Sequence, residues 1–329
     1  MTRYAMLDLC SIREGGGIAD ALANSVSLAQ HAEKWGYSRF WLAEHHNFAG
    51  IASAATSLVI GHVAAATQSI RVGAGGIMLP NHAPLVIAEQ FGTLEALYPR
   101  RIDLGLGRAP GTDQMTVNAL RRNLDGDVNQ FPRDVVELLG FLDEPKPGQA
   151  VVATPGAGSK VPVWILGSSL FGAQLAASLG LPFGFASHFA PAQLNEAVQL
   201  YRHRFSPSRF LDEPYVMAGF NVIAADTTNE ADYLASSMRR AFVNLRRGQP
   251  GKLQPPSAEF NQSLGPADKA LLSQIMACSA VGDRDTVAAK LQAFIDDTGA
   301  NEIIFAGQIF DHEARLRSFE IVAQVMASL

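Results

Sequence analysis

The chain has 329 residues, which is enough for one large domain or two of ordinary size. Its composition, 48% hydrophobic and 17% charged, supplies a large apolar core and excludes an intrinsically disordered protein. The 26 Lys and Arg residues are outnumbered by 31 Asp and Glu residues and are not concentrated in any stretch, which argues against a protein built to hold nucleic acid.

Short apolar runs alternate with longer amphipathic stretches along the whole chain. The apolar runs predict eight β-strands, over residues 4–10, 39–45, 70–79, 101–108, 161–168, 182–188, 215–225 and 302–307. Helical periodicity predicts α-helices over residues 18–35, 53–66, 84–98, 169–179, 191–205, 229–247, 283–298 and 312–327. The sequence is therefore a repeated strand-then-helix pattern.

This alternation requires parallel strands joined by right-handed crossovers, and eight such units close into a (β/α)8 barrel, the TIM barrel. A doubly wound open sheet is the alternative. We favour the barrel because no GxGxxG segment follows the first strand and because polar residues recur just past the strand ends. Two stretches rich in Gly, Pro, Gln and Ser, residues 143–160 and 248–266, interrupt the pattern. We interpret them as insertions after strands four and seven of one domain spanning residues 1–329.

The N-terminus lacks the uninterrupted apolar segment and the cleavage site of a secretory signal, and no apolar run reaches membrane-spanning length. The chain has only two cysteines, Cys10 and Cys278, and no Cys/His cluster, so neither a disulfide framework nor a thiolate metal site is available. A cytoplasmic protein without a membrane partner is expected.

The second predicted strand ends in Glu44, His45 and His46, at the barrel face where active sites form. An imidazole can give and take protons near neutral pH. Because neighbouring strand residues point to opposite sides, only one of the two histidines can face the barrel mouth squarely. We favour His45 as catalytic, whereas a structural role for His46 is as well supported as a catalytic one. No carboxylate and histidine set at ligand spacing accompanies the pair, so no metal site is predicted.

Glycines and a cation mark the next two strand ends. Gly75 and Gly76 interrupt a strong strand, which indicates a bulge, a place where a ligand approaches the backbone, or a tight barrel corner. Arg108 ends the following strand and suits a fixed cation that pairs with a phosphate or an anionic ring. A salt bridge to a neighbouring loop is the alternative for Arg108.

The fifth predicted strand runs into Gly167, Ser168 and Ser169 at the start of a helix. Free backbone N–H groups, the positive end of the helix dipole and two hydroxyls together form an anion site of the kind that seats a phosphate. The alternative is that serine serves only as a helix N-cap. With Arg108 from the adjacent strand, the segment becomes a candidate phosphate clamp.

The chain resembles the bacterial luciferase-like flavin monooxygenases over nearly its whole length, and in particular their single-chain members of unknown substrate. The resemblance is carried, in this order, by FWLAEHHN, VGAGGIMLPNHAPLVIAEQF, RRIDLGLGR, VWILGSS and VGDRDTVAAKLQAFIDDTGANEIIF. It implies a (β/α)8 barrel that binds FMN at its C-terminal mouth, where reduced flavin reacts with oxygen to give a hydroperoxyflavin.

The resemblance also implies roles for individual residues. His45 matches the catalytic histidine of the family, and Arg108 matches an arginine that contacts the flavin. The Gly75–Gly76 bond falls where the family has a non-proline cis peptide beneath the flavin ring. The family's phosphate segment matches Gly167, Ser168 and Ser169, and three more residues at strand ends would border the ring: Asp8, Met78 and Ser187.

From this resemblance we expect an FMN-dependent monooxygenase that oxidises a small organic substrate with molecular oxygen, using reduced flavin from a separate NAD(P)H flavin reductase. A homodimer is expected, and residues 248–266 are interpreted as a lid. Light-emitting members carry a cysteine just before the arginine, where this chain has Gly107, which argues against luminescence. Two alternatives are a deazaflavin-dependent dehydrogenase and a flavin-binding protein without turnover.

Overall fold

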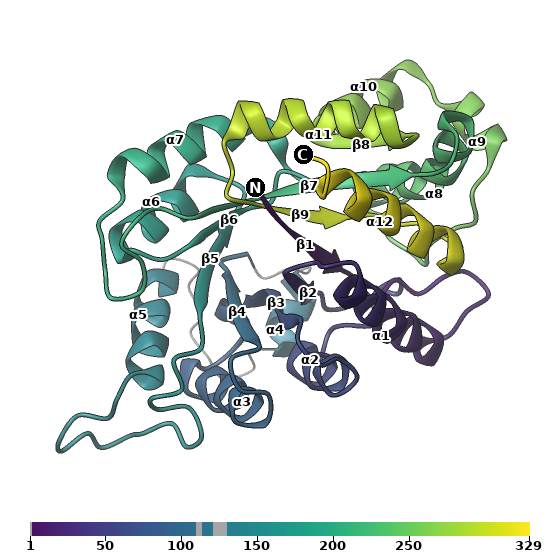
Figure 1. Ribbon diagram of the computed structural model, residues 1–329. Coiled ribbons are helices and arrows are strands. Elements are labelled where there is room, and N and C mark those ends of the chain that lie inside the picture. The colour runs from purple at the N-terminus through teal and green to yellow at the C-terminus, as the bar shows by residue number, and fades with distance from the viewer. Residues whose placement is uncertain (1, 110–113, 121–129) are drawn as a thin grey trace.

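The computed structural model describes residues 2–109, 114–120 and 130–329, and Figure 1 shows its strands enclosed by helices. The strands are β1 (Arg3–Asp8), β2 (Arg39–Leu42), β3 (Arg71–Met78), β4 (Ile102–Gly107), β5 (Val163–Gly167), β6 (Phe183–Phe185), β7 (Val216–Ala224), β8 (Ser279–Gly282) and β9 (Glu302–Ala306). The helices are α1 (Ile18–Lys34), α2 (Thr56–Ala65), α3 (Pro84–Leu97), α4 (Gln114–Leu120), α5 (Phe131–Leu142), α6 (Leu170–Leu179), α7 (Leu194–Arg204), α8 (Thr228–Arg246), α9 (Ala258–Ser263), α10 (Pro266–Ile275), α11 (Arg284–Thr298) and α12 (His312–Met326).

Eight of the strands close into a parallel barrel, which confirms the predicted fold. Strands β1 to β7 pair with their neighbours in chain order, and β9 lies between β7 and β1 to complete the ring. All eight barrel strands lie within the predicted ranges or overlap them. The polar strand ends singled out in the sequence therefore meet at one mouth, because the carboxyl ends of parallel strands share one face.

Strand β8 was not predicted. The nine-residue β7 pairs with β9 through Met217–Asn221 and continues beyond the ring, where Asn221–Ala224 pair with Ser279–Gly282 of β8. The four residues of β8 are too few to show a strand period, and the strand exists because the outer half of β7 offers it an unpaired edge.

Two helices that were not predicted, α4 and α5, precede the first insertion. Helix α5 buries one face through Phe131, Val135 and Leu138, a helical spacing that the sequence already carried. Residues 143–160 themselves are irregular, as expected. The stretch 248–266 is only partly irregular, because α9 forms within it and packs against α8.

A buried charge network closes the barrel at the end opposite the mouth. The Arg39 guanidinium pairs with Asp103 (Nη1 to Oδ2, 2.6 Å) and with Glu302 (Nε to Oε1, 2.8 Å), and it stacks on the ring of Trp164. Burial alone would lower the pKa of Arg39, but the two carboxylates raise it above its ordinary value, so the cation is held charged. Open space in the barrel therefore lies toward the mouth.

None of the helices in the described ranges is long and apolar enough to cross a lipid bilayer.

Candidate active site

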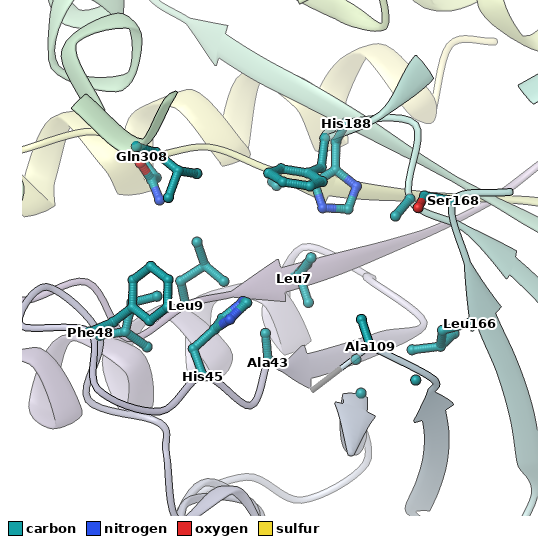
Figure 2. A pocket seen from close by; sticks show the side chains of 18 of the residues that line it. Leu7, Leu9, Ala43, His45, Phe48, Ala109, Leu166, Ser168, His188 and Gln308 are labelled. Atoms are coloured by element: carbon teal, nitrogen blue, oxygen red, sulfur yellow. The ribbon is translucent and has the colours of Figure 1, made fainter. Parts of the chain in front are cut away.

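A cavity of about 550 Å³ opens at the C-terminal ends of the strands. That volume is in the range of small-molecule and cofactor sites. Figure 2 shows Leu7, Ala43 and His45 on one wall facing Ser168 and His188 on the other. Most of the surface between them is apolar, which gives the site a low-dielectric interior.

Eight of the eleven residues predicted to form the site line this cavity, and three lie outside its wall. The eight are His45, Gly75, Gly76, Met78, Arg108, Gly167, Ser168 and Ser169. They come from the ends of four neighbouring strands, β2 to β5, and the fold brings them together because those ends share one face. The three outside the wall are Asp8, His46 and Ser187.

The predicted anion site lies at the β5 end of the cavity. Helix α6 begins directly after Ser169, whose side chain makes no capping hydrogen bond, so the N-cap alternative is not what the structure shows. The Arg108 guanidinium stacks on the Phe171 ring at 4.1 Å, and no ion pair to it is found among the described residues. A cation, two hydroxyls and a helix N-terminus thus face one cavity, which is the donor set that a phosphate requires.

Glycines hollow out the neighbouring part of the barrel. A Cβ added to Gly76 would lie 2.6 Å from the Gly105 carbonyl oxygen, and one added to Gly105 would lie 2.3 Å from the Ala74 carbonyl oxygen. A Cβ on Gly75 would meet Leu7 at 2.8 Å. The Gly75–Gly76 peptide bond is cis, as the family resemblance implied. These residues leave backbone, rather than side chains, as the surface that a flat ring would cover.

Gly107 stands where the light-emitting pattern has a cysteine. A Cβ added to Gly107 would lie 2.8 Å from the sulfur of Met78, so a cysteine there would require the methionine side chain to move. Met78 also borders the cavity. The absence of a side chain at Gly107 therefore leaves room for the Met78 sulfur.

His45 and His46 point in different directions, as expected, although both lie beyond β2, which ends at Leu42. His45 lines the cavity, and its ring lies 5.4 Å from that of Phe48, centroid to centroid (Figure 2). His46 instead contacts Glu44, with 2.7 Å between Nε2 and Oε1. His45 therefore borders the cavity, whereas His46 does not.

Behind the cavity wall, Glu44 joins two histidines. Its Oε1 lies 2.7 Å from His46 Nε2 and 2.9 Å from His82 Nε2, and its Oε2 accepts a hydrogen bond from the Met78 backbone N–H at 2.9 Å. Burial alone would raise the pKa of Glu44, but the hydrogen bonds from the imidazoles and the backbone lower it to about 2. Glu44 is therefore a carboxylate that fixes the ends of β2 and β3.

This cluster corrects one step of the metal argument. The sequence analysis found no carboxylate and histidine set at ligand spacing, yet Glu44, His46 and His82 bring their ligand atoms within 4.8 Å of one another. His82 comes from the turn after β3, so sequence proximity to the His45–His46 pair could not reveal it. The hydrogen bonds to Glu44 already account for how these side chains are placed.

Asp8 is structural and does not border the cavity. Its carboxylate is fully buried and pairs with the Arg315 guanidinium at 2.6 Å, and it accepts a hydrogen bond from the Cys10 backbone N–H at 3.1 Å. Burial alone would raise the pKa of Asp8, but Arg315 and these hydrogen bonds lower it below its ordinary value. Asp8 therefore ties the end of β1 to α12.

Ser187 is also structural. Its hydroxyl is fully buried and donates a 2.6 Å hydrogen bond to the Gly219 carbonyl oxygen. The residue that follows it, His188, lines the cavity instead. The sequence offered both as strand-end residues, but a one-residue choice between them depends on the turn after β6, which no periodicity determines.

The first part of the second insertion, which was interpreted as a lid, reaches the cavity. Residues 250–254, which we term the strap, line the cavity from the outside. The strap is tied to the opposite loop, because Leu253 N–H donates to Ile12 O at 2.9 Å and Glu14 N–H donates to Leu253 O at 2.8 Å. The first part of the predicted lid thus borders the mouth, and α9 does not.

The fold and this cavity define a barrel protein with a proton-carrying side chain and an anion site at one mouth. The family model for luciferase-like monooxygenases matches residues 3–302, and the chain belongs to that family.

Individual relatives agree with this assignment. A luciferase-like monooxygenase of Escherichia coli K12 is 54% identical over 326 residues, which cover 99% of this chain and 97% of that protein. The crystal structure of apo-MsnO8 is 33% identical, covers 99% of both chains and superposes with a TM-score of 0.93. The oxygenating constituent of 3,6-diketocamphane monooxygenase from Pseudomonas putida, solved with FMN, is 17% identical with a TM-score of 0.72 over 98% of this chain and 97% of that chain, which shows the fold alone.

Proposed function

We propose that this chain is an FMN-dependent monooxygenase that uses reduced flavin and molecular oxygen to oxidise a small organic substrate, with the reduced flavin supplied by a separate NAD(P)H flavin reductase. The carrying observation is that one cavity holds Arg108, Ser168 and Ser169 at the N-terminus of α6, a stripe of glycine backbone and His45. Membership of the monooxygenase family supports the class of reaction.

The residues present fit FMN in two respects. Arg108 and the two serines offer a cation and hydroxyl donors to a phosphate group at the β5 end of the cavity. Gly75, Gly76 and their neighbours supply a surface from which a Cβ is excluded by contacts of 2.6 to 2.8 Å, so a planar ring can approach the backbone. Deazaflavin cofactors also carry a phosphate and a flat ring, and they are the second candidate.

Bound flavin supplies the electrons and the oxygen chemistry of such a reaction. The residues of the chain position the reactants, exclude water and supply a proton. His45 lies on the wall facing Ser168 and can deliver or accept a proton at the reacting centre through its imidazole nitrogens (Figure 2). The apolar lining and the strap keep water from the site, which strengthens every electrostatic contact inside it.

In the first test, the protein is titrated with FMN, riboflavin and a deazaflavin, and binding is measured by fluorescence quenching. Arg108→Met is expected to weaken FMN binding about 10- to 100-fold, because hydrogen bonds to charged groups contribute about 1.5–3 kcal/mol. Riboflavin affinity is expected to stay unchanged, since it lacks the phosphate. The exposed Arg204→Met, which lies on the distant helix α7, is the matched control. Absence of FMN binding by the wild type would end the proposal, and preference for the deazaflavin would select the dehydrogenase alternative.

The second test separates an enzyme from a flavin-binding protein without turnover. His45→Asn is expected to leave the FMN dissociation constant unchanged and to slow reoxidation of bound reduced FMN about 100-fold or more, because a positioned proton carrier contributes at least that much. Stopped-flow absorbance follows the reoxidation. Identical traces for wild type and variant would favour the non-catalytic protein.

We further propose that the protein is a homodimer that associates through α2 and α3. These adjacent helices both expose a large apolar side chain, with Leu58 75% exposed on α2 and Leu97 63% exposed on α3. Exposed apolar side chains that lie together mark interaction surfaces, and a second copy of this chain would cover both helices at once. Sedimentation of the wild type as a dimer and of Leu58→Glu/Leu97→Glu as a monomer is expected. A monomeric wild type would contradict this.

A further inference from the structure

His188 is a cavity residue whose role is not explained by the contacts that hold the fold together. It follows β6, and its imidazole extends from the wall that also carries Ser168 into the cavity (Figure 2). Its backbone is fixed on both sides, because Ser187 Oγ donates to Gly219 O at 2.6 Å and Asn221 Nδ2 donates to His188 O at 2.6 Å. The ring is therefore held in one place.

A cradle in β7 is shaped to this ring. A Cβ added to Gly219 would lie only 2.1 Å from His188 Nδ1, so the imidazole in this position requires glycine beneath it. Nδ1 thus occupies the space that a Cβ at position 219 would need, is buried, and has no hydrogen-bond partner in the described parts of the chain. The opposite edge of the ring, which carries Nε2, is the edge left facing the cavity.

The placement of Nδ1 determines which nitrogen carries the proton. A buried N–H without an acceptor loses its hydrogen bonds to water, and a bare lone pair against a carbon is less costly than an N–H in the same place. The Nε2–H tautomer is therefore favoured. Burial also lowers the pKa of His188 to about 4, so the ring is neutral at pH 7 and offers one N–H to the cavity.

We propose that His188 is a flavin-binding residue, in which the Nε2–H group donates a hydrogen bond to an acceptor oxygen or nitrogen on the uncharged part of the cofactor. The inference rests on the proposed flavin function. β6 pairs with β5, Gly167 lying opposite Phe185, so His188 stands beside the end of the cavity assigned to the phosphate. A neutral donor suits an uncharged acceptor there, whereas Arg108 serves the anion.

His188 and His45 thus have different roles. His45 lies on the opposite wall of the same cavity and is placed for proton transfer (Figure 2). His188 cannot easily accept a second proton, because that proton would sit at Nδ1 against the Gly219 backbone. Its contribution is a permanent N–H donor of fixed direction.

Three substitutions at position 188 test the proposal by binding alone. His188→Leu keeps an apolar side chain but removes the donor, and we expect it to weaken FMN and riboflavin binding by the same factor, about two- to tenfold. His188→Gln can place an amide N–H near the Nε2 position and is expected to restore affinity, whereas His188→Asn places it near Nδ1 and is not. Thermal unfolding verifies that each variant is folded.

Long-range ¹H–¹⁵N spectra of histidine-labelled wild type give an independent readout. The proton is expected on Nε2 between pH 8 and pH 5.5, and its resonance is expected to shift when FMN is added. A proton on Nδ1, equal FMN affinity in His188→Leu and wild type, or a loss confined to FMN with riboflavin unaffected would each overturn the proposal. A wild type that fails to bind FMN would instead end the proposed function, while the tautomer measurement would still stand.

Discussion

Glu44 holds together the strand ends behind the cavity. Removing its charge should therefore lower the free energy of unfolding by an amount that can be calculated. The side chain is 1% exposed, and its pKa is lowered from 4.5 to about 2 by bonds from His46, His82 and the Met78 backbone. That difference corresponds to about 3 kcal/mol of unfolding free energy at neutral pH. We therefore expect Glu44→Gln to lose about 3 kcal/mol, a large fraction of the total for a protein that is stabilised by about 5–15 kcal/mol.

The stabilisation that Glu44 provides should depend on pH in one direction. Because the pKa of Glu44 is lower in the folded state than in the unfolded chain, its contribution is complete above pH 4.5 and is lost as the pH falls toward 2. The deficit of Glu44→Gln relative to wild type should therefore shrink by about 1 kcal/mol between pH 7 and pH 4.

Urea unfolding followed by circular dichroism at the two pH values measures both quantities. Glu213→Gln, which alters an exposed carboxylate, serves as the control and should unfold like the wild type at each pH. If Glu44→Gln is as stable as wild type at pH 7, or if its deficit is the same at pH 7 and pH 4, then the carboxylate does not stabilise these strand ends as argued.

Four further substitutions test how the barrel and the strap are packed. Gly105→Ala should destabilise the fold by about 1–3 kcal/mol or more, because its Cβ would lie 2.3 Å from a backbone oxygen. Gly140→Ala, in the exposed and open part of α5, should instead stabilise the fold by about 1 kcal/mol. Thermal unfolding compares the two variants. Asp8→Asn should cost about 3–5 kcal/mol by leaving a buried guanidinium unpaired, and a loss below 1 kcal/mol in urea would contradict this. Leu253→Pro removes the N–H that ties the strap to the opposite loop, and faster hydrogen exchange at residues 250–254 is the expected result.

Strand and helix periodicity predicted the barrel because each unit is a local pattern that repeats. Eight strands and eight helices follow from the alternation of two periods, and closure follows from their number and handedness. Strand β8 and helix α9, within the second insertion, do not belong to that repeat. Their formation depends on an edge of β7 and on the surface of α8, which are tertiary features.

Site residues were predictable where a residue type implies a chemistry, and not where a one-residue rotation decides the outcome. Arg108 and the serines before α6 reach the cavity because strand ends carry them there. Asp8 and Ser187 also stand at strand ends, but their side chains turn to Arg315 and to the β7 backbone. Strand alternation separates two faces, yet the last residue of a strand leaves that alternation, so its direction is set by its partners.

Part of the cavity wall is glycine backbone, at Gly75 and Gly76. Gly75, Gly76 and Gly105 remove Cβ atoms that would collide with backbone or with Leu7, and Gly219 does the same beneath His188. Glycine at these strand positions lowers the intrinsic stability of the sheet. The barrel tolerates them because the charge network around Arg39 and the Glu44 cluster fix the strands above and below the gap. A ring that enters this space would therefore meet backbone already held in place, so that little ordering remains to oppose binding.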